Sequence, residues 1–73
     1  MIEIFATNVA SAEDSLWLKS ELLQQFPDSK ISFDLEDCDR ILRIERFNAA
    51  HIATDEVIRC LQQNGFECKI FID

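Results

Sequence analysis

Three cysteines, Cys38, Cys60 and Cys68, are the residues of this chain best suited to chemistry, and no two of them form a Cys-x-x-Cys pair. Three thiols cannot all pair within one chain, and unpaired thiols are typical of a reducing compartment. Thiolates bind Cu(I) and Zn(II) when several ligands lie close together. The first question is therefore whether the fold brings these sulfur atoms near one another, or near a carboxylate such as Asp14.

The other reactive groups do not form a recognisable catalytic set. His51 is the only histidine, and we expect it at the surface, without a nucleophile to activate. The acidic run of residues 36–39 lacks the glycine of a calcium loop, so a solvated turn is the better prediction. Gly65 is the only glycine, which excludes a glycine-rich phosphate loop. We therefore predict that the protein is not an enzyme and requires no cofactor.

Composition and charge narrow the class of protein further. The 73 residues are 48% hydrophobic and 29% charged, which predicts one folded domain over residues 1–73. The formal charge of −7 repels phosphate, so nucleic acid and anionic membranes are unsuitable partners. The first residues lack the basic and apolar segments of a signal peptide. A cytoplasmic protein is expected.

The elements that must position these groups follow from the apolar period. Residues 2–7 alternate as in a strand, with Ile2, Ile4 and Ala6 on one parity. From Ala12 to Phe26 a leucine or phenylalanine recurs every four residues, which predicts a helix that ends at Pro27.

The second half of the chain predicts a hairpin, a second helix and a last strand. Residues 30–46 predict a β-hairpin whose acidic turn, 36–39, is longer than two residues because it contains no glycine. A second helix follows, with a cap candidate at Asn48 or Thr54 and an end at Asn64-Gly65. Residues 66–72 alternate as a last strand.

The order of strand, helix, strand, strand, helix and strand predicts an α+β, ferredoxin-like βαββαβ sandwich. Its antiparallel sheet has the strand order 4-1-3-2. Both helices cover one face of that sheet, and the other face is open.

With this plan, the chain resembles the heavy-metal-associated domains, the small copper-chaperone-like proteins, over essentially its whole length. The resemblance lies in "DLEDCD" before the third strand, "LRIE" within it, and "VIRCLQQNGFEC" in the second helix and beyond. In that family the first loop and helix start carry Met-x-Cys-x-x-Cys. The matching positions here read Val9-Ala10-Ser11-Ala12-Glu13-Asp14, so Ser11 and Asp14 stand where the two metal thiolates would be.

Two interpretations of Ser11 and Asp14 remain open. A hydroxyl and a carboxylate are poor ligands for soft metal ions, and the same two residues resemble a capping box that starts a helix. The alternative is an atypical copper or zinc site built from Asp14, Cys38 and Cys68, which the topology places at one end of the sheet. We expect Cys60 and Cys68 to be small core residues and Cys38 to be an exposed thiol.

The sequence also indicates a contact surface. Trp17 lies on the side of the first helix opposite Leu18, Leu22 and Phe26, where the pattern predicts no intramolecular role for it. Strand parity is expected to send Phe5, Ile41 and Phe71 to the open sheet face, beside Arg43 and Lys69. We therefore expect a protein-interaction module that forms a homodimer or binds a partner protein through that face. Heavy-metal binding or transfer is the alternative function.

Overall fold

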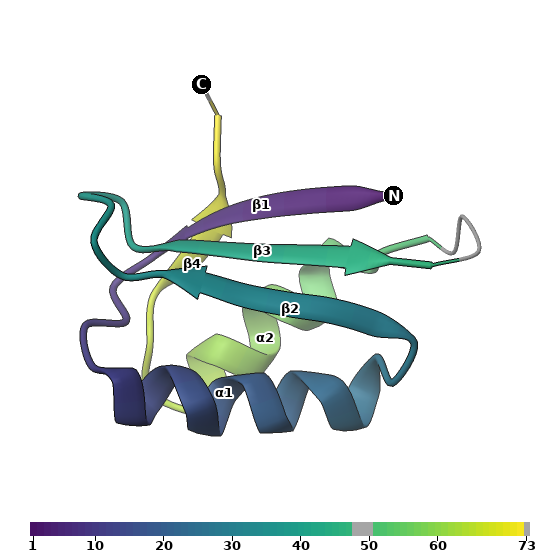
Figure 1. Ribbon diagram of the computed structural model, residues 1–73, viewed down its shortest axis with the longest axis horizontal. Helices are drawn as coiled ribbons and strands as arrows, with labels where there is room; N and C mark the ends of the chain where they lie inside the picture. Colours follow the sequence, from purple (N-terminus) through teal and green to yellow (C-terminus); the bar gives the residue numbers. More distant parts are fainter. Residues whose placement is uncertain (48–50, 73) are drawn as a thin grey trace.

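The computed structural model describes residues 1–47 and 51–72 of the chain. In order, its elements are β1 (Ile2–Thr7), α1 (Ala12–Gln25), β2 (Ser29–Asp34), β3 (Ile41–Arg46), α2 (Thr54–Gln63) and β4 (Cys68–Ile70). The described strands form one antiparallel sheet in the order β2-β3-β1-β4. Both helices lie on the same face of this sheet (Figure 1). The α+β, ferredoxin-like fold and the strand order are therefore as predicted.

Helix α1 begins and ends where its sequence directs. Ser11 is the N-cap, and its hydroxyl accepts a hydrogen bond from the Asp14 backbone N–H at 3.0 Å. Phe26 is the C-cap, directly before Pro27, and a residue that precedes proline is disfavoured in the helical conformation. Leu18 and Leu22 are fully buried. One apolar face and two local signals are thus enough to define the helix.

Helix α2 starts without the cap that the sequence suggested. Thr54 is its first residue, and the N-cap is Ala53, whose side chain makes no capping bond. The other cap candidate, Asn48, lies outside the described residues. The end is as predicted, because Gly65 has a φ of +89°. The N–H groups of Gly65 and Phe66 bond to the carbonyls of Gln62 and Leu61, which is the Schellman arrangement.

The register of the sheet decides which side chains meet the helices. Phe5 lies opposite Leu42 in β3, Ile31 lies opposite Ile44, and all four side chains are buried. The core beneath the helices is completed by residues from both helices, the loops and β4, namely Val9, Leu18, Leu22, Phe26, Ile52, Val57, Cys60, Leu61 and Cys68. This sheet face supplies the centre of the core.

The expectation that Phe5 faces outward is wrong, because Phe5 is 0% exposed. In β1 both parities carry apolar residues, so alternation alone leaves the choice open. The large ring fills the core opposite Leu42, and the smaller Ile2, Ile4 and Ala6 are left to the open face.

The β2–β3 connection is longer than a two-residue hairpin turn, and the last strand is shorter than its alternating sequence suggests. Residues 35–40 link β2 to β3, and Arg40 adopts a φ of +46° near the end of this turn. The Thr7 N–H donates to the Asp39 carbonyl at 3.0 Å, which ties the turn to the end of β1. Strand β4 covers three residues, shorter than the predicted 66–72. No helix among the described residues is both long and apolar enough to cross a membrane.

Candidate functional site

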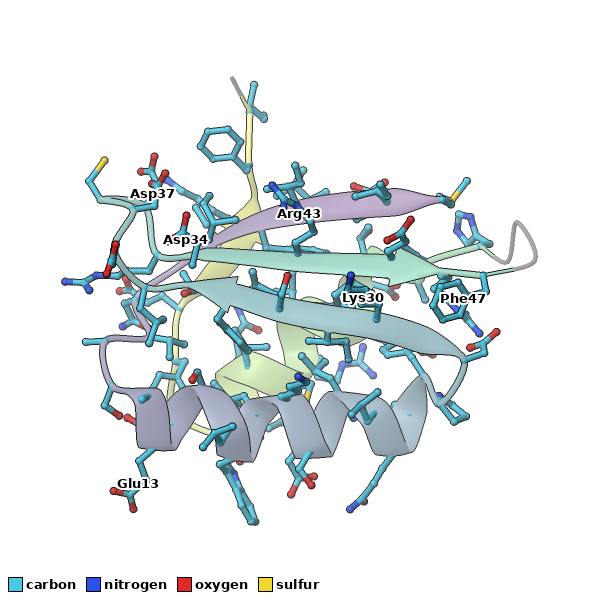
Figure 2. All side chains as sticks on the ribbon, in the orientation of Figure 1. Glu13, Lys30, Asp34, Asp37, Arg43 and Phe47 are labelled. Atoms are coloured by element: carbon cyan, nitrogen blue, oxygen red, sulfur yellow. The ribbon has the colours of Figure 1, made fainter. Side chains whose placement is uncertain are left out.

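The face of the sheet opposite the two helices is left uncovered by the described elements. The pairing places residues of all four strands on it, namely Ile2, Ile4, Ala6, Lys30, Ser32, Asp34, Ile41, Arg43, Glu45 and Lys69. Phe71 follows β4 on the same parity, and its N–H donates to the Ile4 carbonyl at 2.9 Å. Figure 2 shows Lys30 on β2 and Arg43 on the neighbouring β3.

The apolar residues of this face differ in exposure. Ile2 is 52% exposed, and Ile4 and Phe71 are partly exposed. Ile41 lies on the open face as predicted, but it is only 9% exposed and offers little contact area. The predicted position of Phe71 on the open face is therefore confirmed, whereas its role in an interaction stays a prediction. Ile2 and Ile4 lie on the same face and were not part of the predicted surface. The size of Phe5 could have indicated this. If the largest side chain of β1 is assigned to the core, then Ile2 and Ile4, on the other parity, must face outward.

Charge distinguishes this face from the rest of the acidic chain. Lys30, Arg43 and Lys69 are exposed there, and they are three of the seven basic residues in a chain of net charge −7. A hollow on the face is lined by Ile2, Ile4, Lys30, Ser32, Arg43 and Glu45. A second hollow, next to β4, is lined by Ala6, Asp39, Lys69, Ile70, Phe71 and Ile72. The face thus combines apolar side chains with three basic and two acidic ones, Asp34 and Glu45, whereas the whole chain has twice as many acidic as basic residues.

The loop between β1 and α1 is a helix start. The Ser11 hydroxyl accepts from Asp14 N–H, the backbone N–H of Ser15 bonds to the Ser11 carbonyl at 3.1 Å, and Glu13 and Asp14 lie in the first turn. Their negative charges are favourable at the positive end of the helix dipole. The cap interpretation is therefore confirmed for Ser11. The bond in the other direction, from the Ser11 N–H to the Asp14 carboxylate, is not among the hydrogen bonds of the described residues.

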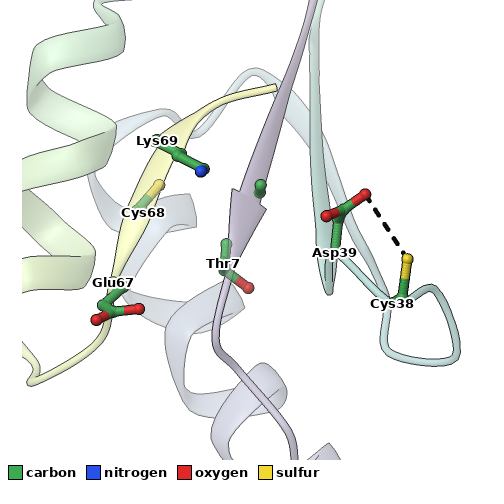
Figure 3. Close-up of a pocket in the computed structure, with 7 residues that line it drawn as sticks. Thr7, Cys38, Asp39, Glu67, Cys68 and Lys69 are labelled. Carbon is green, nitrogen blue, oxygen red and sulfur yellow. Dashed lines mark hydrogen bonds between the residues drawn. The ribbon is translucent and has the colours of Figure 1, made fainter. Parts of the chain in front are cut away.

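Two of the three proposed metal ligands border one hollow at the hairpin end of the sheet. Cys38, Cys68 and Thr7 line it together with Ala6, Asp39, Glu67 and Lys69, whereas Asp14 does not. In Figure 3 the end of β1, with Thr7, lies between the Cys68 side and the Cys38 side. The Thr7 hydroxyl donates to the Arg40 carbonyl at 2.6 Å, which holds β1 against the turn. The fold therefore brings Cys38 and Cys68 to one end without gathering Asp14 with them.

The two buried thiols are in an environment that opposes ionisation. Burial, and then the neighbouring Cys60 thiol, raise the pKa of Cys68 to about 12. Burial, and then the negative charge of Glu21, raise the pKa of Cys60, while a hydrogen bond with Gln25 lowers it. The thiolate is the form that binds metals. Cys60 and Cys68 are thus core residues, as predicted, and Cys68 is poorly suited to hold an ion.

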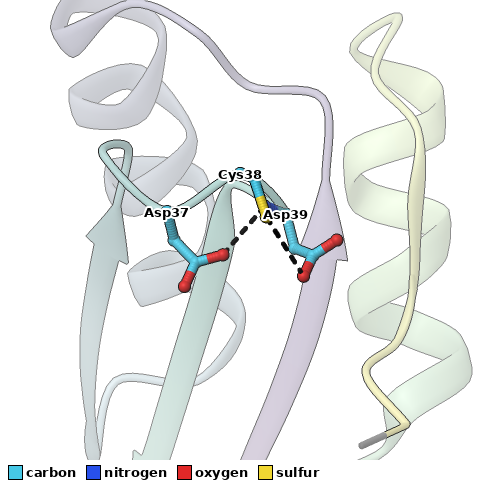
Figure 4. A group of neighbouring side chains, drawn as sticks. All are labelled: Asp37, Cys38 and Asp39. Atoms are coloured by element: carbon cyan, nitrogen blue, oxygen red, sulfur yellow. Dashed lines mark hydrogen bonds between the residues drawn. The ribbon is translucent and has the colours of Figure 1, made fainter.

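The tip of the β2–β3 turn carries a compact group of potential ligands. Asp37, Cys38 and Asp39 are exposed, and one ligand atom from each lies within 4.8 Å of the others. The Asp39 N–H donates to the Asp37 carboxylate at 2.8 Å, and the Cys38 Sγ lies 3.9 Å from Asp39 Oδ2 (Figure 4). The first contact is an Asx turn, which explains the local geometry without an ion.

Trp17 has an intramolecular contact that the sequence did not indicate. Its side chain is 55% exposed, and the indole Nε1–H donates to Asn64 Oδ1 at 3.1 Å. The Asn64 amide in turn donates to the Cys60 carbonyl at 2.8 Å. Trp17 therefore links α1 to the end of α2 and is both exposed and structural. His51 is exposed, as predicted, and its carbonyl accepts a hydrogen bond from Arg46.

No family model, curated protein or solved structure matches this chain. The resemblance to heavy-metal-associated domains stays a prediction.

Proposed function

We propose that the protein is a non-enzymatic interaction domain whose open sheet face binds a partner protein. One observation carries the proposal: the uncovered face presents Ile2, Ile4 and Phe71 beside Lys30, Arg43 and Lys69, within a strongly acidic chain. Apolar patches of this kind often mark association sites. Basic side chains around such a patch favour a partner that offers apolar and acidic residues together, because complementary charge increases the association rate and specificity.

The proposal is tested by reversing charge on one face at a time. The variant Arg43→Glu with Lys69→Glu changes the open face, and the matched control Lys19→Glu with Arg59→Glu makes the same change in net charge on α1 and α2. We expect a partner captured by the unmodified protein to be lost with the open-face variant and retained with the control. Equal retention by both variants, or shift changes confined to the helices in backbone NMR of the complex, would overturn the proposal.

Heavy-metal binding is a second candidate, supported by the close approach of Asp37, Cys38 and Asp39. A titration of the reduced protein with Cu(I) and with Zn(II), followed by backbone NMR, separates the two places where an ion could bind. Shifts at residues 36–40 that disappear in Cys38→Ser would support a site at the turn. Shifts at residues 9–15 would instead support a site that involves Asp14, and unchanged spectra at both places would exclude this candidate.

A further inference from the structure

The outer edge of β2 is a second surface with an unusual property: its sequence is complementary to itself. Within the described part of the chain, β2 is the last strand on its side of the sheet, and it is six residues long. The opposite edge, β4, covers only three residues. A long edge strand presents unpaired backbone groups to other chains, and proteins commonly block such an edge with a charged side chain.

The hydrogen-bonding pattern shows which residues of β2 face this edge. The Phe47 N–H donates to the Asp28 carbonyl at 3.3 Å, in line with the β2–β3 register. Because hydrogen-bonded pairs alternate along an antiparallel ladder, the even-numbered residues of β2 direct their backbone groups toward β3. Ile31 and Phe33 therefore direct their N–H and carbonyl groups outward, where another strand can pair with them.

A second copy of β2, run antiparallel, fits this edge when Ser32 lies opposite Ser32. Ile31 then forms hydrogen-bonded pairs with Phe33 of the second copy, using the outward backbone groups. On the open face, Lys30 lies opposite Asp34 of the second copy, and this pair occurs twice. Both side chains are exposed, and one Asp34 oxygen accepts from the Glu36 N–H at 3.2 Å, leaving the other oxygen for Lys30. Lys30 would oppose pairing with an unrelated strand. In this arrangement it is matched, because Asp34 of the second copy lies opposite it, two residues from the central Ser32.

The helix layer offers apolar contact at the same edge. Helix α1 packs against β2, and α2 packs against β4. Figure 1 shows α1 running alongside the outer strand β2. Trp17 points to α2, where it bonds to Asn64. Leu16 is about 100° from Trp17 around the helix, and it shares a side of α1 with Leu23, which is seven residues further on. Leu16 is 67% exposed, and Leu23, two turns later, is partly exposed.

From these observations we infer that the protein forms a two-fold symmetric homodimer through β2–β2 pairing, which joins two sheets into one of eight strands. Ser32 lies next to the symmetry axis, and Leu16 and Leu23 of the two α1 helices pack together above it. A two-fold axis requires a self-complementary patch, and the run Lys30-Ile31-Ser32-Phe33-Asp34 provides one. This dimer pairs through the backbone edge of β2 but shares Lys30 with the proposed partner face. The cross-link at Ser32 reports the dimer, and partner capture by Arg43→Glu with Lys69→Glu reports the partner face, so the two failures are distinguishable.

Cross-linking tests the contact and its register directly. In a Cys38→Ser background, Ser32→Cys places two sulfur atoms across the axis in a non-hydrogen-bonded pair, whose Cα separation of about 4.5 Å is within disulfide range. Arg43→Cys is the matched control, because it lies opposite Ser32 on β3, on the same face and one strand further in. Its two copies would be about 14 Å apart, three strand spacings. With oxidised glutathione we expect a covalent dimer from Ser32→Cys and little from Arg43→Cys.

A charge exchange tests the pairing without a new thiol. Lys30→Glu and Asp34→Lys each place like charges opposite one another twice, and we expect each to weaken dimerisation roughly tenfold in sedimentation velocity. The double variant exchanges the two charges and should return the dimer constant to within about threefold of the unmodified value. A monomer at every concentration up to the millimolar range, or equal cross-linking of Ser32→Cys and Arg43→Cys, would overturn the inference.

Discussion

The two faces of the sheet are built from the same four strands but differ in burial. The helix-covered face buries Phe5, Leu42 and Ile44 completely. The open face uses the neighbouring residues of the same strands, such as Ile4 and Arg43, and leaves them partly or fully exposed. Because strand side chains alternate, each residue on the covered face fixes where its neighbours point. The open face is therefore determined by what the core requires.

The two faces differ in how strongly the fold restricts their side chains. On the covered face, close packing restricts volume, so changes in residue size are costly. On the open face, exposed side chains are free to serve binding, because little in the fold depends on them. We therefore expect that substitutions on the open face can change the proposed partner binding without a large change in stability.

The largest expected effect compares a covered position and an open-face position of the same strand, β1. We expect Phe5→Ala to lower the free energy of unfolding by roughly 3–5 kcal/mol, because it leaves a cavity at the centre of the core. Ile2→Ala, at a position 52% exposed, should change it by only about 0.5 kcal/mol. Denaturant unfolding followed by circular dichroism measures both. If Phe5→Ala does not fold, Phe5→Leu should still destabilise more than Ile2→Ala, and similar values for the two positions would contradict the contrast.

Much of this architecture was predictable from the sequence because the hydrophobic period changes clearly at each element. The limits of α1, the turn at residues 36–39 and the end of α2 at Gly65 were all predicted within a few residues. The helix limits depend on a serine cap, a proline and a glycine with positive φ, and the turn is marked by its run of acidic residues.

The errors came from features that local chemistry does not decide. The direction of Phe5 depends on the register with β3, and the bond between Trp17 and Asn64 joins residues 47 positions apart. The self-complementary edge of β2 required the strand order and the alternation of hydrogen bonds. The burial of Ile41 likewise depends on neighbouring strands. Such long-range contacts are the information that one sequence read along its length lacks.

The difference between buried and exposed positions can also be tested with two cysteines. Cys38 and Cys68 border the same hollow, but Cys38 is exposed and Cys68 is buried. At pH 8 we expect iodoacetamide to modify exposed Cys38 readily and Cys68 far more slowly, because Cys68 is buried and its raised pKa lowers the fraction of reactive thiolate. Mass spectrometry of timed digests measures both rates. Cys38→Ser should abolish the fast modification, and comparable rates at the two thiols would show that Cys68 is not buried.

The same raised pKa predicts a pH dependence of stability. The unfolded chain loses the Cys68 proton near pH 9, whereas the folded chain retains it until about pH 12. Between these values the unfolded state binds fewer protons, so the stability present below pH 9 falls as the pH rises. Denaturant unfolding at pH 8 and at pH 10.5 measures this loss. The slope should be smaller in Cys68→Ala and unchanged in Cys38→Ala, and equal slopes in all three proteins would refute the assignment.

The smallest expected effect on stability concerns the N-cap of helix α1. Ser11→Ala removes the acceptor for the Asp14 N–H and should destabilise the protein by roughly 1 kcal/mol. Ser11→Asp keeps an acceptor and adds a favourable charge at the helix start, so it should retain the stability. Ser20→Ala, an exposed position within α1, controls for helix propensity and should be neutral or slightly stabilising. Thermal melts in metal-free buffer distinguish the two interpretations of Ser11, because a cap stabilises without an ion, whereas a metal ligand would reveal its contribution only after copper or zinc is added.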